Sequence, residues 1–329
     1  MPNFPEGEYC MKNLNQEEIK NLLPHRYENL LIDEEDIYEE EAIKKGVLKL
    51  TVNKNDSLKR DVFFKETKDN KVFIEPVYME ILALGSIVSM GTLPEGITAF
   101  FSAITNYKKN GDIKEGQLLI GEVEKGKAKG DFHRFSGVIK NENNDLIAEG
   151  DLMAFAMNAS LGVADSDKKQ IEIPNKTMEE IVQKNHFSWK SSSMVFVDKI
   201  VNYNEEGTIV TEYTYPQDHV FTQGHFPGNP VMMGISQWIA GADALWLYAS
   251  KQLAAGNIAG TSVTLSADID IVKSDGTVTA ELKNCVCSAP IIGNVLGEMS
   301  VTSTKKLYFR DIVKPNDSLV IIAKNILIQ

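Results

Sequence analysis

The amino-acid sequence contains two long apolar segments, which stand at corresponding places in its two halves. Residues 77–90 (VYMEILALGSIVSM) and residues 235–248 (ISQWIAGADALWLY) are nearly all apolar over a length that favours a buried helix over a strand. A helix that is apolar on every side has to be covered on every side. Each half of the chain is therefore predicted to wrap its other elements around one central helix.

Shorter strings repeat in the same order as the apolar segments. Residues 15–19 resemble residues 177–181, about 162 positions later, and residues 29–33 resemble residues 194–198, about 165 positions later. This period is too long for a solenoid repeat. At roughly 100–200 residues per domain, a chain of 329 residues is predicted to hold two copies of one α+β domain.

We predict domain boundaries at 1–160 and 161–329, because a polar stretch at residues 160–177 separates the copies. Each domain is expected to be a mostly antiparallel sheet around one long buried helix. In the first copy, Asn15 is predicted to cap a short helix that ends before Pro24. Strands are predicted at residues 30–32, 46–52, 99–107, 117–124, 131–140 and 146–156.

Composition argues against several classes of protein. The chain carries 34 Lys and Arg against 46 Asp and Glu, and a formal net charge of −12 disfavours a broad nucleic-acid surface. No apolar run approaches the roughly 18–20 residues that span a bilayer, and the first residues do not resemble a secretory signal. Three cysteines (Cys10, Cys285 and Cys287) suit neither a disulfide framework nor a metal site. We expect a cytoplasmic protein without a membrane span.

The segment at residues 223–234 (QGHFPGNPVMMG) carries the clearest chemical signal. Two prolines and several glycines around His225 describe a fixed, tightly turned loop. Gly234 lies where the second apolar helix begins, and free N–H groups at a helix N-terminus favour an oxyanion. His225 is therefore a candidate base beside an oxyanion donor. The alternative is a turn in which the histidine has only a structural role.

The string GHFPGNPVMMG resembles the signature of bacterial 3-hydroxyacyl-(acyl carrier protein) dehydratases, which have the hotdog fold. Met233 departs from the family, which usually has proline there. The resemblance implies that His225 is catalytic, that the Gly234 N–H polarises the thioester carbonyl, and that nearby residues contact the substrate. Those substrate-binding residues are Phe226, Pro227, Gly228 and Val231.

The family also carries a catalytic acid fourteen residues after the histidine. That position is Ile239 here, which cannot exchange protons, and Asp243 one turn later is a possible substitute. In the first half, residues 77–84 resemble the helix that carries the acid and place Glu80 in the acid position. The histidine loop is missing from that half, where residues 63–67 (FFKET) stand instead.

The resemblance therefore implies one composite site, with His225 from the second half and Glu80 from the first. In hotdog dehydratases the histidine and the acid come from two protomers, so the two halves are expected to pack as an intrachain pseudo-dimer. The mirror-image site would have neither group and should be inactive. His25 and Arg26 also match an early loop of the family, for which a structural or interface role is expected. No metal or organic cofactor is implied.

The function implied is dehydration of 3-hydroxyacyl thioesters to trans-2-enoyl thioesters, in fatty acid or related acyl-chain synthesis, with acyl carrier protein as the expected carrier. Alternatives are an isomerase or hydratase acting on coenzyme A thioesters, and a non-catalytic acyl-thioester-binding subunit. A higher homo-oligomer is also possible. Two groups of basic residues could meet an acidic carrier protein, or could be ordinary solvated surface. They are Lys305, Lys306, Arg310 and Lys314, and Lys125, Lys127, Lys129 and Arg134.

One feature of the second half departs from the first. Residues 306–319 resemble the strand–turn–strand unit that follows the helix directly in this family, but here they come last, after residues 263–286. Either the strands of the second half are permuted, or one of these matches is accidental.

Overall fold

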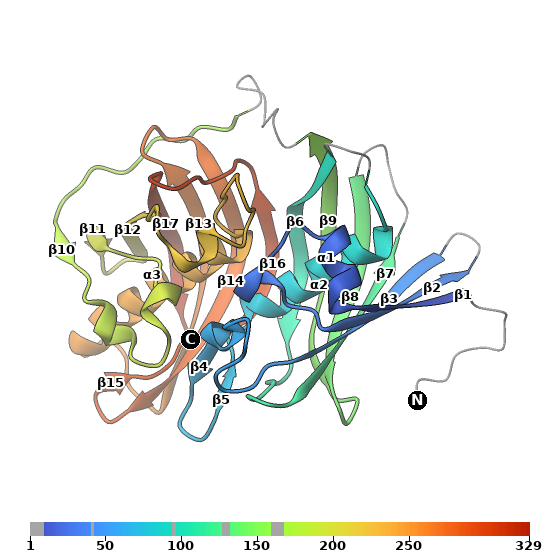
Figure 1. Ribbon diagram of the computed structural model, residues 1–329. Coiled ribbons are helices and arrows are strands. Elements are labelled where there is room, and N and C mark those ends of the chain that lie inside the picture. The colour runs from blue at the N-terminus through green and yellow to red at the C-terminus, as the bar shows by residue number, and fades with distance from the viewer. Residues whose placement is uncertain (1–9, 41–42, 94–96, 127–131, 159–167) are drawn as a thin grey trace.

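The computed structural model describes residues 10–329 except 41–42, 94–96, 127–131 and 159–167 (Figure 1). The predicted domain boundary between residues 160 and 161 lies outside the described residues, as do Lys127 and Lys129 of one basic group. Among the described residues, no helix has the length and apolarity needed to cross a membrane.

The first half contains a short helix, a long helix and one run of sheet strands. The helices are α1 (Gln16–Leu22) and α2 (Pro76–Met90). The strands are β1 (Cys10–Asn15), β2 (Glu34–Glu40), β3 (Ile43–Thr51), β6 (Ile97–Lys109), β7 (Leu118–Lys125), β8 (Phe132–Asn141) and β9 (Leu146–Asn158). A separate small hairpin pairs β4 (Phe64–Glu66) with β5 (Lys71–Phe73).

The second half has the same plan around one long helix, α3 (Gly234–Ala254). Its strands are β10 (Glu180–Ile181), β11 (Lys199–Asn204), β12 (Thr208–Thr214), β13 (Ser262–Lys273), β14 (Val278–Ile292), β15 (Val295–Leu296), β16 (Ser300–Phe309) and β17 (Ser318–Ile328). The two predicted central helices and most of the predicted strands are therefore confirmed, with ends shifted by a few residues.

The two halves are joined edge to edge into one antiparallel sheet. β6 pairs with β16, where Ile104 lies opposite Leu307. Figure 1 shows α2 against the first-half strands and α3 against the second-half strands, with β6 and β16 between them. The ring of Tyr107 on β6 meets Trp238 on α3 edge to face, with 5.0 Å between ring centroids, so the apolar core continues across the junction. This is the predicted double hotdog fold.

The strands of the second half are permuted along the chain but not in space. The sheet order is β3-β7-β8-β9-β6 in the first half and β12-β17-β13-β14-β16 in the second. β16 and β17 therefore occupy the places of β6 and β7, although they come last in the chain instead of directly after the helix. The resemblance of residues 306–319 to the family's strand–turn–strand unit is thus real, and the strands are permuted.

One local prediction is wrong, and one repeated sequence string has different structures in the two halves. Leu30, Leu31 and Ile32 are buried as predicted, but they form a connection rather than a strand, because β2 begins only at Glu34.

The sequence repeat at residues 177–181 does not have the structure of its counterpart in the first half. In the first half, Asn15 and Glu18 form a capping box that starts α1. In the second half, the backbone N–H groups of residues 177 and 178 donate to the carbonyl of Val201, and the segment runs extended beside β11.

Candidate active site

A cavity of about 300 Å³ lies between α2 and the beginning of α3. Its wall is mainly apolar, and both halves of the chain contribute to it. Met79, Ala83 and Phe100 come from the first half, whereas Ile235 and Val313 come from the second. A narrow apolar cavity with a few polar groups is the usual form of a site for a small acyl ligand.

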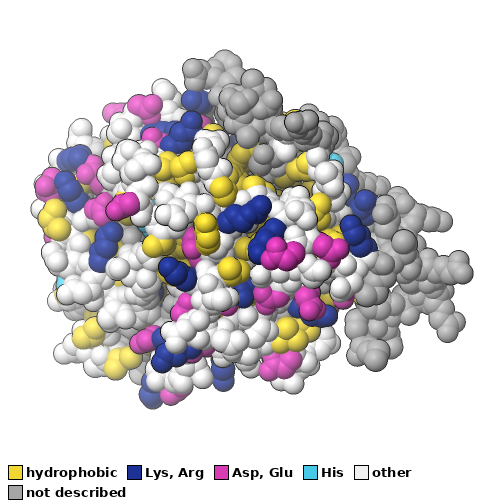
Figure 2. Space-filling model, viewed as in Figure 1, with side chains coloured by type: hydrophobic (Ala, Val, Ile, Leu, Met, Phe, Trp, Pro, Cys, Tyr) yellow, Lys and Arg dark blue, Asp and Glu magenta, His cyan; other side chains and the backbone are white. Residues whose placement is uncertain are grey.

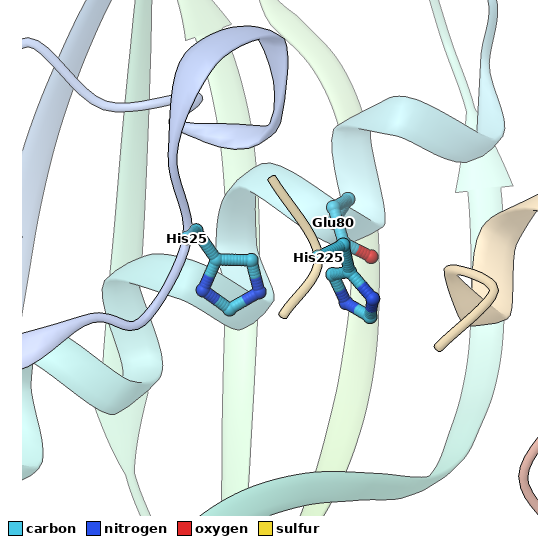
Figure 3. Close-up of side chains that lie close together, drawn as sticks. All are labelled: His25, Glu80 and His225. Carbon is cyan, nitrogen blue, oxygen red and sulfur yellow. The ribbon is translucent and has the colours of Figure 1, made fainter. Parts of the chain in front are cut away.

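Three titratable side chains meet at this cavity: His25, Glu80 and His225. They come from the connection after α1, from α2, and from the loop before α3 (Figure 3). Each offers one nitrogen or oxygen atom, and these atoms lie within 4.8 Å of one another. Glu80 and His225, which come from opposite halves of the sequence, are therefore brought together.

The loop before α3 fixes the tautomer of His225. Its Nδ1 lies 2.9 Å from the backbone oxygen of Val231, and since a carbonyl only accepts, Nδ1 carries the proton and Nε2 keeps its lone pair. Burial lowers the pKa of His225 to about 4, against an ordinary value of 6.5. At neutral pH the ring is uncharged and its Nε2 can accept a proton.

Glu80 has the opposite tendency. It lies in the first turns of α2, where its neighbours Met79 and Ile81 are fully buried. Burial raises the pKa of Glu80 to about 7, against an ordinary value of 4.5. Glu80 therefore holds its proton up to nearly neutral pH, as a general acid must.

Gly234 is the first residue of α3 and lines the same cavity. The first N–H groups of a helix have no partner inside the helix and lie at its positive end. A side chain cannot be added here without displacing a ring, because a Cβ on Gly234 would lie 2.7 Å from Cζ of Phe309. Because Phe309 packs so closely, residue 234 has to be glycine for the end of α3 to stay open to the cavity.

The predicted substrate-binding residues divide into two groups. Phe226 and Val231 line the cavity, whereas Pro227 and Gly228 do not. The ring of Phe226 stacks on His225 with 4.3 Å between ring centroids, and it meets Phe100 edge to face at 5.7 Å. Phe226 therefore packs against the histidine as well as facing the cavity.

His25 lies closer to His225 than its motif alone indicated. Its ring centroid is 5.0 Å from that of His225, it is only 3% exposed, and its Nδ1 has no hydrogen-bond partner. Burial, together with the neighbouring His225 and Arg26, lowers the pKa of His25. The early-loop motif had indicated this residue, but nothing in the sequence showed that it would reach the loop of the other half.

The contact between the two loops is a backbone contact. The Arg26 N–H donates to the Gly224 carbonyl at 3.0 Å. A Cβ on Gly224 would lie 2.2 Å from the Arg26 oxygen, so only glycine allows this approach. The Arg26 guanidinium in turn donates to the carbonyl oxygens of Leu23 and His25, both at 2.7 Å. These bonds hold His25 against His225.

His25, Glu80 and His225 are also, among the described residues, a group that could hold a metal ion. Two imidazoles and a carboxylate are ligands that Zn²⁺ accepts. Bound in this way, the metal would occupy the atoms that proton transfer requires. The expectation that no cofactor is needed stays a prediction.

Neither alternative acid position reaches the cavity. Ile239 is buried in the core of α3. Asp243 forms an ion pair with Lys190, and each side chain is 1% exposed. The second carboxylate oxygen of Asp243 accepts from the Phe196 N–H at 2.9 Å. Asp243 is thus fully engaged away from the cavity that Glu80 lines.

Comparison with known proteins agrees with the fold and with the resemblance found in the sequence. A family model described as a FabA-like domain matches residues 190–291. The 3-hydroxyacyl-[acyl-carrier-protein] dehydratase FabZ of Halalkalibacterium halodurans is 33% identical over 142 residues, which are 43% of this chain and 96% of that protein. The FabZ of Enterococcus faecalis is 33% identical over 139 residues, which are 41% of this chain and 92% of that protein.

Two solved structures are also similar. The dehydratase domain from the CurK module of curacin polyketide synthase covers 87% of this chain and 95% of its own, at 11% identity and a TM-score of 0.45. The dehydratase heterocomplex ApeI:P from Xenorhabdus doucetiae covers 43% of this chain and 92% of its own, at 15% identity and a TM-score of 0.35.

The fold and the site define a hotdog-fold protein of the dehydratase class. More narrowly, the chain belongs to the 3-hydroxyacyl-[acyl-carrier-protein] dehydratase FabZ family. The resemblance stated from the sequence is confirmed.

Proposed function

We propose that this protein is a hydro-lyase that dehydrates 3-hydroxyacyl thioesters to trans-2-enoyl thioesters at one composite site. The observation that carries the proposal is the meeting of His225 and Glu80, which bring a ring nitrogen and a carboxylate oxygen within 4.8 Å although they belong to different halves. One of these groups is a neutral base and the other a protonated acid over the same range of pH. An elimination of water needs such a pair.

In the proposed reaction, Nε2 of His225 removes the proton from the α-carbon of the substrate. The electron pair of that bond forms the double bond between the α- and β-carbons as the β-carbon–oxygen bond breaks. Glu80 gives its proton to the departing hydroxyl, which leaves as water. The Gly234 N–H stabilises the negative charge that develops on the thioester oxygen. Return of one proton from His225 to Glu80 completes the cycle.

The mainly apolar cavity supports an acyl chain as the part of the substrate that is bound. Met79, Ala83 and Leu84 on α2 line it together with Phe155 and Ile235. Burial of a chain in such a wall contributes about 0.8 kcal/mol per methylene. The affinity for the substrate is therefore expected to rise with chain length until the cavity is filled.

Acyl carrier protein is the proposed carrier, and an exposed arginine at the cavity supports it. Arg310 lines the cavity and is exposed, with its Nε 2.8 Å from a carboxylate oxygen of Glu281. Three lysines close to Arg310 in the sequence are also exposed, namely Lys305, Lys306 and Lys314. On the face seen in Figure 2, basic and acidic side chains are interspersed. An acidic carrier would therefore meet a local basic group and not a uniformly positive surface. The cytoplasmic location stays a prediction.

The test is to incubate the protein with a 3-hydroxyacyl thioester on acyl carrier protein and, in parallel, on coenzyme A. Formation of the enoyl thioester is followed by mass spectrometry of the acyl chain. We expect loss of water from the carrier-protein substrate at the higher kcat/KM. Binding of both thioesters without loss of water would instead show a non-catalytic acyl-binding protein. Shift of an enoyl double bond without dehydration would show an isomerase.

A further inference from the structure

A second cluster of charged side chains lies at the interface, at the mirror-image position of the proposed active site. The 165-residue shift that matches residues 29–33 to 194–198 places Lys190 opposite His25. The helix alignment that places Glu80 opposite Ile239 places Glu75 opposite Gly234. Lys65 lies in the segment that replaces the histidine loop.

Backbone contacts agree with this correspondence in position, although the direction of the hydrogen bond is reversed. In the active site, Arg26 N–H donates to the carbonyl of Gly224 across the two halves. At the mirror position, Glu66 N–H donates to the carbonyl of Trp189 at 2.6 Å, and Lys65 forms an antiparallel bridge with Lys190. The same two kinds of loop therefore meet in both places.

The first ion pair of the cluster bridges the halves through its hydrogen bonds. Lys65 Nζ lies 2.6 Å from Oε1 of Glu75, and both side chains are 1% exposed. Lys65 also donates to the Met299 carbonyl at 2.8 Å and to Oγ of Ser300 at 2.7 Å. The other oxygen of Glu75 accepts from the Val301 N–H at 3.4 Å. Both members of a first-half pair thus bind the start of β16.

The second ion pair faces it from the other half. Lys190 and Asp243 are paired, and the backbone N–H of Phe196 donates to the same carboxylate. Burial lowers the pKa of Lys190, and the ammonium of Lys65 lowers it further, whereas Asp243 raises it. The two pairs are therefore close enough to interact electrostatically.

Glu75 cannot serve as the acid in dehydration, and neither pair is exposed to a substrate. Although burial alone would raise it, the ammonium groups of Lys65 and Lys109 hold the pKa of Glu75 at about 2. A carboxylate that stays ionised has no proton to give. Both pairs are also nearly inaccessible to solvent, with each of the four side chains 1% exposed.

We propose that the mirror-image site has become an interdomain clamp, in which the buried pair Lys65–Glu75 holds the two halves in register. The buried pair Lys190–Asp243 of the second half lies beside it. Glu75 directly precedes α2, and Glu80 lies in the first turns of that helix. The bonds from Lys65 and Glu75 to residues 299–301 therefore fix α2, and with it Glu80, relative to the half that carries His225. Lys65 and Glu75 are positioning residues. The inference rests on the proposed function where its test uses activity.

The experiment compares a Lys65→Met/Glu75→Gln double variant with Lys109→Met. The double variant removes the bridging pair without leaving a buried charge alone, because Lys109 keeps Asp112 at 2.8 Å. Lys109 is the matched control, since it also binds Glu75, at 3.0 Å, but all its ion pairs lie within the first half. Ser300→Ala is a milder variant that removes one bond from Lys65 and leaves every charge paired.

We expect kcat of the double variant to fall about tenfold with KM changed less than twofold, because small displacements of a catalytic group are costly. Lys109→Met should stay within twofold in both constants. Hydrogen exchange at the amides of Glu66 and Val301 should quicken in the double variant and in Ser300→Ala, but not in Lys109→Met. A double variant with wild-type kcat and exchange would overturn the clamp, and so would a control that loses as much activity.

If the double variant does not fold, exchange in Ser300→Ala decides the question, and unchanged exchange there overturns the clamp. Exchange also separates the two proposals. A wild-type protein without dehydratase activity defeats the proposed function but leaves the exchange comparison intact. Normal wild-type activity with unchanged exchange in every variant defeats the clamp alone.

Discussion

His225 and Glu80 come from different halves of one chain, and a ring nitrogen of His225 lies within 4.8 Å of a carboxylate oxygen of Glu80 at the wall of one cavity. Burial acts on both side chains but moves their pKa values in opposite directions, because it disfavours the charged form of each. The base is thereby kept neutral and the acid protonated. Fusion of the two halves makes this pair a permanent feature of the chain.

The first prediction concerns the pH dependence of dehydration. His225 is protonated below about 4, and Glu80 loses its proton above about 7. The kcat/KM profile of the wild type should therefore be bell-shaped, with an acidic limb near 4 from His225 and an alkaline limb near 7 from Glu80. Glu80→Gln should keep the acidic limb in its residual activity and lose the alkaline one. An alkaline limb that persists near pH 7 in Glu80→Gln would assign it to another group.

The second prediction concerns stability. The pKa of Glu80 is about 7 in the folded protein and 4.5 ordinarily, so its contribution to stability is fully present below pH 4.5 and is lost as the pH rises through 7. The loss is about 3 kcal/mol by linkage. The stability of Glu80→Gln does not fall in this way, because glutamine does not titrate. The pH-dependent contribution of His225 to stability is the same in both proteins and cancels in the comparison. In urea unfolding from pH 4.5 to 7.5, the free energy of unfolding of the variant should rise relative to that of the wild type by about this amount. Parallel stability curves would show that Glu80 titrates normally.

The third prediction concerns the start of α3. Gly234→Ala would place a Cβ 2.7 Å from the ring of Phe309 at the proposed oxyanion site, and we expect kcat/KM to fall by roughly 10- to 100-fold. Gly241→Ala is the matched control on the same helix, because its Cβ would meet only the flexible end of Ile269, at 2.8 Å from Cδ1. Its kcat/KM should stay within about threefold. Equal losses in the two variants would point to helix packing instead of oxyanion stabilisation.

The fourth prediction concerns metals. Nε2 of His225 has to accept a proton and Glu80 has to give one, which neither can do as a metal ligand. Dialysis against a strong chelator should therefore leave kcat unchanged. Loss of activity that Zn²⁺ restores would show instead that His25, Glu80 and His225 work around a bound ion.

Much of this arrangement could be predicted from the sequence because it depends on periodic or short-range patterns. The two apolar segments became α2 and α3, and the loop around His225 leads into Gly234 as its turn residues indicated. The strand predicted at residues 30–32 is absent because a short apolar run indicates that the residues are buried, but not whether they pair with a neighbouring strand. The permuted strands left a local resemblance at residues 306–319, but their place beside β6 depends on long-range pairing.

The place of His25 in the site was not foreseen for the same reason. It depends on the approach of Gly224 to Arg26, two positions in different halves. Asp243 looked available as an acid because its partner, Lys190, is distant in the sequence. Both cases depend on contacts between segments that are distant in the sequence and come together only in the folded chain.

The central claim is that His225 and Glu80 act together as one site within one chain. The most direct measurement is single-turnover dehydration of a 3-hydroxyacyl thioester by the wild type, His225→Ala, Glu80→Gln and the double variant. Each single variant should lose at least about 100-fold in rate, and the double variant should lose little more than the worse single one. Wild-type rates in either single variant, or losses that multiply in the double variant, would contradict the composite site.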